Sequence, residues 1–129
     1  MKRLLMGTML LATAGAASAD WTVAGDNDQF SLYVDRATIR RNGNLVKMWD
    51  LVDFKTVQTG PGGESYLSSK TQEQYDCKEE RSRQIAFTWF DGKMGSGKVV
   101  VSDSDPGKWK PIAPESVAAA LWKIACGKK

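Results

Sequence analysis

Residues 81–101, RSRQIAFTWFDGKMGSGKVVV, decide the fold class of this chain. Ile85, Phe87 and Trp89 alternate with smaller or polar residues, which is the period of two expected of a β-strand with one apolar face. A glycine-rich turn follows, and residues 98–101 then supply the valines of a returning strand. The stretch therefore predicts an antiparallel hairpin with one face against a core.

Four segments upstream of this hairpin also have the composition of strands: residues 21–24, 30–34, 45–56 and 64–76. The third has apolar residues at both odd and even positions, which predicts a central strand covered on both faces. The fourth is mostly polar, and we interpret it as an edge strand. Asn42-Gly43 is the strongest hairpin dipeptide, and residues 35–38 are interpreted as a turn or the start of a short helix.

The C-terminal segment has the pattern of a helix. Its apolar residues recur at spacings of three and four, namely Val117, Ala118, Leu121, Trp122 and Ala125. Pro114 suits a first helical turn, and Gly127 is a typical stop. Strands followed by one helix indicate an α+β fold, in which an antiparallel sheet of about six strands carries a C-terminal α-helix packed on one face.

The N-terminal 19 residues have the order of parts found in a secretory signal peptide. Lys2 and Arg3 precede an apolar run at residues 4–14, and Ala17 and Ala19 are the small residues of a cleavage site before Asp20. The run is shorter than the roughly 20 residues of a membrane-spanning helix, so a signal peptide is favoured over an anchor. We predict a signal peptide at residues 1–19 and one domain at residues 20–129.

This cleavage determines the expected location and charge of the mature protein. Asp20, rather than a cysteine, follows the cut, so we expect an exported protein, periplasmic or extracellular, with no lipid anchor and no transmembrane segment. Loss of Lys2 and Arg3 leaves 16 of the 18 Lys and Arg residues against 15 Asp and Glu, a net charge of +1. So weak a charge argues against nucleic-acid binding, which needs a basic stripe.

The two cysteines, Cys77 and Cys126, are predicted to form a disulfide, because an exported protein with an even pair lacking metal-site spacing favours one. The alternative, a redox-active pair, is disfavoured because no CxxC motif is present to lower a thiol pKa. In the chain-entropy model, a disulfide that closes the loop between Cys77 and Cys126 stabilises the folded state by roughly 4 kcal/mol.

Candidate catalytic groups are few. The chain has no histidine, and Asp50 and Asp53 lie three apart on one strand, so their side chains point to opposite faces and are expected to be solvated. Residues 92–98 match the start of a phosphate-binding loop, but Val99 stands where the motif needs Ser or Thr, and a strand follows where it needs a helix. Residues 103–105 resemble the opening of a calcium loop without its later ligands. We expect no catalytic, metal or cofactor site, and therefore a protein that is not an enzyme.

A candidate ligand surface is formed by Arg36, Arg40, Arg41 and Trp109. These arginines, with Lys47 and Lys55, are predicted to group on neighbouring strands as an anion-binding patch, although a solvated polar face is the more frequent arrangement. Trp109 and Trp21 lie near element ends, where a tryptophan either caps the core or is exposed for a partner, and core is favoured for both. The other three tryptophans, Trp49, Trp89 and Trp122, have core-like neighbours.

An ordered set of segments resembles the surface-adhesin protein E family. The set comprises residues 33–41, 46–49, 75–78, 81–83 and 109–116, with Ser65, Ser68, Ser69, the 92–97 turn and Cys126. This resemblance implies a small extracytoplasmic domain, with a C-terminal helix tied by the disulfide to an antiparallel sheet.

The resemblance also implies a function, because the named members of this family are bacterial surface adhesins that bind host matrix and serum proteins. The leading hypothesis is thus an exported, non-enzymatic binding module for an extracellular or host matrix or serum protein. The alternative is a periplasmic, envelope-associated structural protein. A homodimer through an exposed edge strand is a further prediction.

Overall fold

The computed structural model describes residues 19–128, so the predicted signal peptide lies outside the described residues except for Ala19. The elements in chain order are β1 (Thr22–Asp26), β2 (Phe30–Asn42), β3 (Leu45–Thr59), β4 (Ser65–Asp76), β5 (Arg81–Phe90), the 3-10 turn η2 (Lys93–Gly95), β6 (Val99–Asp103), β7 (Lys110–Pro111) and α1 (Val117–Cys126). Within these residues, no helix has the length and apolar character that a membrane crossing requires.

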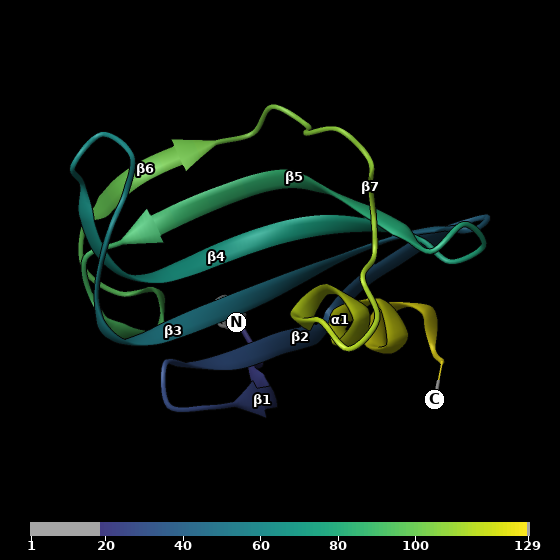
Figure 1. Cartoon of the computed structure of the whole chain (residues 1–129), viewed down its shortest axis with the longest axis horizontal. Helices are drawn as coiled ribbons and strands as arrows, with labels where there is room; N and C mark the ends of the chain where they lie inside the picture. Colours follow the sequence, from purple (N-terminus) through teal and green to yellow (C-terminus); the bar gives the residue numbers. More distant parts are fainter. Residues whose placement is uncertain (1–18, 129) are drawn as a thin grey trace, which may run out of the picture.

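The strands form one antiparallel sheet in the order β1-β2-β3-β4-β5-β6, with the short β7 beside β5. Figure 1 shows α1 lying in front of one end of this sheet and leaving the other end of the same face uncovered. The predicted α+β fold, with its antiparallel sheet and C-terminal helix, is confirmed. The interpretation of residues 64–76 as an edge strand is wrong, because β4 pairs with both β3 and β5.

The long β2–β3 hairpin turns one residue later than the sequence predicts. Asn42 pairs with Leu45, so Gly43 and Asn44 make the turn and Asn42 belongs to the strand. Gly43 has a φ of 64°, a backbone conformation that glycine adopts without steric cost.

Residues 35–38 form neither a turn between elements nor a helix start. They lie in an irregularity of β2, where the register with β3 shifts between Asp35 and Arg40. The Thr38 hydroxyl fills the gap, since it accepts a hydrogen bond from the Trp49 amide (3.0 Å) and donates one to the Asp35 carbonyl (2.6 Å). A side chain thus replaces a missing partner of the strand ladder.

The main core lies between α1 and one face of the sheet, called here the helix face. Leu32, Val34, Val46, Met48 and Tyr75 meet Leu121, Ala125 and Cys126 of the helix. The predicted apolar stripe of the helix and its stop at Gly127, whose φ is 69°, are confirmed. The prediction that the first helical turn includes Pro114 is wrong. The helix begins at Val117, and Ser116 caps it by accepting a hydrogen bond from the Ala119 amide (3.1 Å).

The disulfide Cys77–Cys126 is formed as predicted and joins the last residue of α1 to the residue after β4. Beside it, the Trp122 indole donates a hydrogen bond to the Asp76 carbonyl (2.9 Å). These two links hold the C-terminal end of α1 against the sheet.

The opposite face of the sheet is partly covered by the turn between β5 and β6. The Ser68 hydroxyl accepts a hydrogen bond from the Gly95 amide (2.8 Å), and the Asp53 carboxylate accepts one from the Met94 amide (2.8 Å). Residues 92–98 therefore form a hairpin turn that lies against the opposite face of the sheet. This confirms the prediction of a turn, which was favoured over a phosphate-binding loop.

Candidate interaction surface

Four polar side chains lie side by side across four strands of the opposite face. Arg40 of β2 pairs with Lys47 of β3, Lys47 with Gln74 of β4, and Gln74 with Arg83 of β5. Residues directly opposite one another share a face of the sheet. Because Lys47 lies between the core residues Val46 and Met48, all four side chains point away from α1.

Trp109 extends this set at the edge of β5. The guanidinium groups of Arg81 and Arg83 lie over its ring, at 4.6 and 4.9 Å from the ring centroid. Cations at this distance are attracted to the negative face of an aromatic ring. We call Arg40, Lys47, Gln74, Arg83 and Trp109 the basic–aromatic row.

Hydrogen bonds hold the two arginines of β5 in place. The Arg83 Nε donates to the Gln74 Oε1 (2.8 Å), and the Arg81 Nε donates to the Asp76 Oδ2 (3.0 Å). Hydrogen bonds from the Glu79 and Lys78 amides, together with Arg81, lower the pKa of Asp76, so this carboxylate stays ionised. The arginines over Trp109 are therefore restrained before any partner arrives.

A hollow of about 220 Å³ opens at the β2–β3 end of the row. Its lining residues are Arg40, Arg41, Asn42, Leu45, Lys47 and Gln74. Two of these side chains, those of Arg40 and Lys47, are cationic and lie on this face, and none of the six is acidic, so the hollow suits a carboxylate or another anion. Arg40 and Arg41 are both exposed. The Arg40 guanidinium donates to the Ala37 and Ile39 carbonyls of β2. Arg41 donates to the Gly43 carbonyl and to the Cys77 sulfur, which places its side chain on the helix face.

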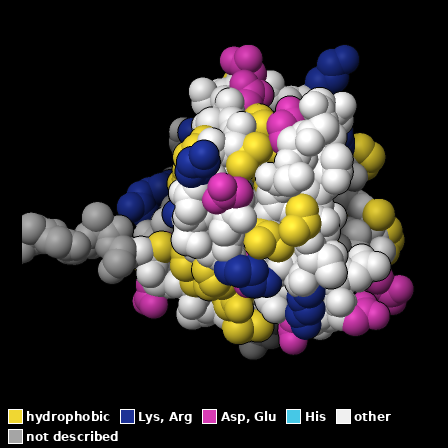
Figure 2. Space-filling view, turned by 90° about the vertical axis from the view of Figure 1, so that its left-hand side faces the viewer, with side chains coloured by type: hydrophobic (Ala, Val, Ile, Leu, Met, Phe, Trp, Pro, Cys, Tyr) yellow, Lys and Arg dark blue, Asp and Glu magenta, His cyan; other side chains and the backbone are white. Residues whose placement is uncertain are grey.

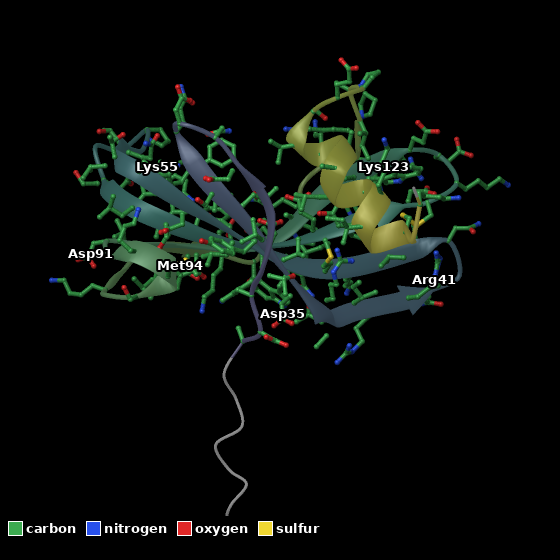
Figure 3. The ribbon with its side chains drawn as sticks, turned by 90° about the horizontal axis from the view of Figure 1, so that it is seen from below. Asp35, Arg41, Lys55, Asp91, Met94 and Lys123 are labelled. Atoms are coloured by element: carbon green, nitrogen blue, oxygen red, sulfur yellow. A yellow bond between two sulfur atoms is a disulfide. The ribbon has the colours of Figure 1, made fainter. Side chains whose placement is uncertain are left out.

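The predicted basic patch is assembled only in part. Arg40 and Lys47 come together at the hollow, whereas the side chain of Arg41, which also lines it, points to the helix face. Arg36 lies apart from them in the β2 irregularity, and Lys55 pairs with Asp26 (3.1 Å). Figure 3 shows Arg41 and Lys55 at opposite ends of the sheet.

The tryptophans lie in different surroundings. Trp109 is half-buried under the two guanidinium groups rather than in the main core, contrary to the preference for a core position. Trp122 packs against that core, whereas Trp89 stacks on Tyr66 with a centroid distance of 4.2 Å.

Arg81, Arg83 and Gln74 were not singled out from the sequence. The spacing of Arg81 and Arg83, two residues apart on a strand, already places them on one face. Their alignment with Lys47 and Arg40 depends on the register of three strand pairs, which no local signal contains.

The expectation that Asp50 and Asp53 are solvated is wrong, because their exposed fractions are 4% and 8%. They do lie on opposite faces, as predicted: Asp50 faces α1, whereas Asp53 binds the η2 turn and Lys93 (3.4 Å). Among residues 19–128, no group of three or more acidic or cysteine side chains is arranged to hold a metal ion.

Figure 2 shows the end of the molecule remote from the hollow. Hydrophobic side chains reach the surface there between charges of both signs, without forming one basic area.

The fold is that of a small α+β module closed by one disulfide. The family described as Surface-adhesin protein E matches residues 21–127, and the chain therefore belongs to the surface-adhesin protein E family. Membership in this family points to a non-enzymatic protein with an exported or surface location.

Solved structures of protein E from Haemophilus influenzae have the same fold. Crystal form II is 13% identical with a TM-score of 0.61, covering 81% of this chain and 91% of that chain. Protein E from a non-typeable strain is 15% identical with a TM-score of 0.61, covering 91% and 82%. A comparison with curated proteins gave no significant match.

Proposed function

We propose that this chain is an exported binding module that attaches to an extracellular protein of the host matrix or serum through its basic–aromatic row. The observation that carries this proposal is the alignment of Arg40, Lys47 and Arg83 in register, ending at Trp109. Tryptophan and arginine are the residues that contribute most often to binding energy at protein interfaces.

The chemistry of the row favours a partner segment with exposed carboxylates. The hollow beside Arg40 offers cationic donors, while Trp109 offers an apolar ring that its arginines already orient. Restraint before binding lowers the entropy that the complex loses. An acidic segment lying along the row would meet both features in succession.

A periplasmic, envelope-associated role is the second candidate. It is favoured by one observation: both cysteines of the chain are joined in the disulfide, so neither carries a lipid. Fractionation separates the two candidates. Loss of the protein when intact cells are treated with protease supports surface display, whereas protection until the outer membrane is opened supports the periplasmic role.

Binding of the oxidised protein to a panel of immobilised matrix and serum proteins tests the proposal. We expect saturable binding to at least one of them, and binding about tenfold weaker for the double variant Arg40→Gln/Lys47→Gln. The variant Lys98→Gln/Lys123→Gln is the matched control, because it removes the same charge from exposed positions outside the row. Equal affinity of the two variants would contradict the proposal.

A further inference from the structure

A second cavity lies on the helix face, between the first turns of α1 and the sheet. Its volume is about 330 Å³, at the lower end of the range for small-molecule sites. Leu32 and Val52 of the sheet and Val117 and Leu121 of the helix form apolar walls. It is on the other side of the sheet from the basic–aromatic row.

Four polar side chains of the sheet line the same cavity: Asp50, Thr71, Glu73 and Tyr75. Tyr75 is only 1% exposed, and its hydroxyl has no hydrogen-bond partner among the residues that the structure describes. An unpaired buried hydroxyl costs free energy that a bound polar ligand would recover. Within residues 19–128, the carboxyl groups of Asp50 and Glu73 likewise form no ion pair.

Two acidic groups so placed interact with each other and with the phenol. Burial raises the pKa of Glu73 to about 7, although Lys110 on β7 partly opposes this. Burial, and then the charge of Glu73, raise the pKa of Asp50, and burial followed by both carboxylates raises the pKa of Tyr75. The α1 residues that line the cavity are apolar, so no charge on the helix neutralises these carboxylates.

We propose that this cavity binds the protonated amine of a short alkylamine, with the ammonium group between Asp50 and Glu73 and the alkyl chain against Leu121 and Val52. A buried carboxylate needs a cationic partner, which an ammonium group supplies. The ammonium group donates hydrogen bonds to the carboxylates and to the unpaired Tyr75 oxygen. An anion would be repelled by the carboxylates, and a purely apolar ligand would leave the phenol unpaired.

Two sources present this chemistry, a free alkylamine and a lysine side chain of another protein. Titration of the full mature domain with n-butylamine and with Nα-acetyl-lysine-N-methylamide, followed by amide chemical shifts in NMR spectra, distinguishes them. n-Butanol is the neutral control of the same length. We expect n-butylamine to shift the signals of residues lining the cavity and n-butanol not to shift them.

The carboxylate variants give the decisive comparison. Asp50→Asn and Glu73→Gln remove one negative charge each from the cavity and should fold, and we expect each to weaken amine binding about tenfold. The matched control is Asp53→Asn, a buried carboxylate on the same strand but the opposite face, which should leave amine binding unchanged. Wild-type binding should strengthen from pH 5.5 to pH 8, because the carboxyl groups ionise while the amine, with a pKa of about 10, stays protonated.

Each result has a definite meaning. Binding of both amines supports recognition of a lysine side chain, and binding of n-butylamine alone supports a site for free amines. Absence of binding by either amine at pH 8, or equal shifts with n-butanol, would overturn the proposal. Failure of the proposed adhesion leaves these outcomes unaffected, because the row and the cavity lie on opposite faces.

Discussion

Buried carboxyl groups of this domain differ according to the face of the sheet on which they lie. Asp53, on the opposite face, accepts a hydrogen bond from the Met94 amide and pairs with Lys93. Asp50 and Glu73, on the helix face, line a cavity whose walls from β2 and α1 are apolar. One strand thus carries an ion-paired carboxylate and a desolvated one within three residues.

Glu73 should make the stability of the domain depend on pH. Its folded pKa of about 7 exceeds the ordinary value of 4.5, so the folded state binds the proton more tightly. This contribution to stability is complete below pH 4.5 and is lost as the pH rises through 7. We expect the free energy of unfolding to fall between pH 5 and pH 8.

Urea unfolding of Glu73→Gln at several pH values tests this dependence. The variant should show a smaller fall in stability than the wild type and should be the more stable of the two at pH 8. Glu79→Gln, at an exposed position, is the control and should retain the wild-type dependence. A steeper fall in Glu73→Gln would contradict the assignment.

Helix α1 is the element that closes the core, and both of its ends are fixed by side chains. Ser116 caps the N-terminal end, and the disulfide with the Trp122 hydrogen bond fixes the C-terminal end. The first turn covers the cavity, whereas the last turn packs in the core. Substitutions at the two ends of α1 should therefore lower the free energy of unfolding by different amounts.

At the N-terminal end, Ser116→Ala should lower the free energy of unfolding by about 1 kcal/mol, because the Ala119 amide loses its acceptor. Ser116→Asp restores an acceptor and should recover most of the loss. Chemical denaturation measures both variants, and equal losses in the two would argue against a capping role.

At the C-terminal end, replacing Cys77 and Cys126 by serine should lower the free energy of unfolding by about 4 kcal/mol or less. The bond closes a loop with a sequence separation of 49 residues, and its loss frees the end of α1. Thermal unfolding of the double variant, compared with the oxidised wild type, measures the effect. Unchanged melting temperatures would show that the disulfide contributes nothing to stability.

The elements themselves were largely predictable, and their exceptions have physical causes. The alternation of residues 85–89 and the helical stripe at residues 117–125 are local patterns, and both elements form as expected. β4 looked like an edge because of its polar residues. The structure buries several of these with partners: Ser68 binds the η2 turn, and Asp76 accepts two amide hydrogen bonds. Long-range hydrogen bonds of this kind leave no trace in local hydropathy.

On the scale of the whole molecule, the two faces of one sheet carry different chemistry. The basic–aromatic row lies on one face, and the acidic cavity under α1 lies on the other. Arg40 and Trp109 could be proposed from residue type, but their place in one row could not. That row depends on the register of strands β2 to β5 and on a loop that returns Trp109 beside Arg83. A homodimer through β1 or β6, the outer strands of the main order, stays a prediction.

The predicted export also concerns the chain as a whole. Protein recovered outside the cytoplasm should begin at Asp20, because Ala17 and Ala19 satisfy the cleavage rule. Intact-mass spectrometry of such protein measures this directly. A mass that still includes Met1 or Lys2 would contradict the signal-peptide prediction.

The central claim is that the partner binds to the basic–aromatic row. Its most direct test is to add a matrix or serum protein that binds in the panel to the isotope-labelled mature domain, and to map the changes in its NMR signals. The account predicts that the largest changes fall on Arg40, Lys47, Gln74 and Arg83 and on the indole N–H of Trp109. Changes confined to β1, or to α1 and its cavity, would show that the partner binds elsewhere and would contradict the claim.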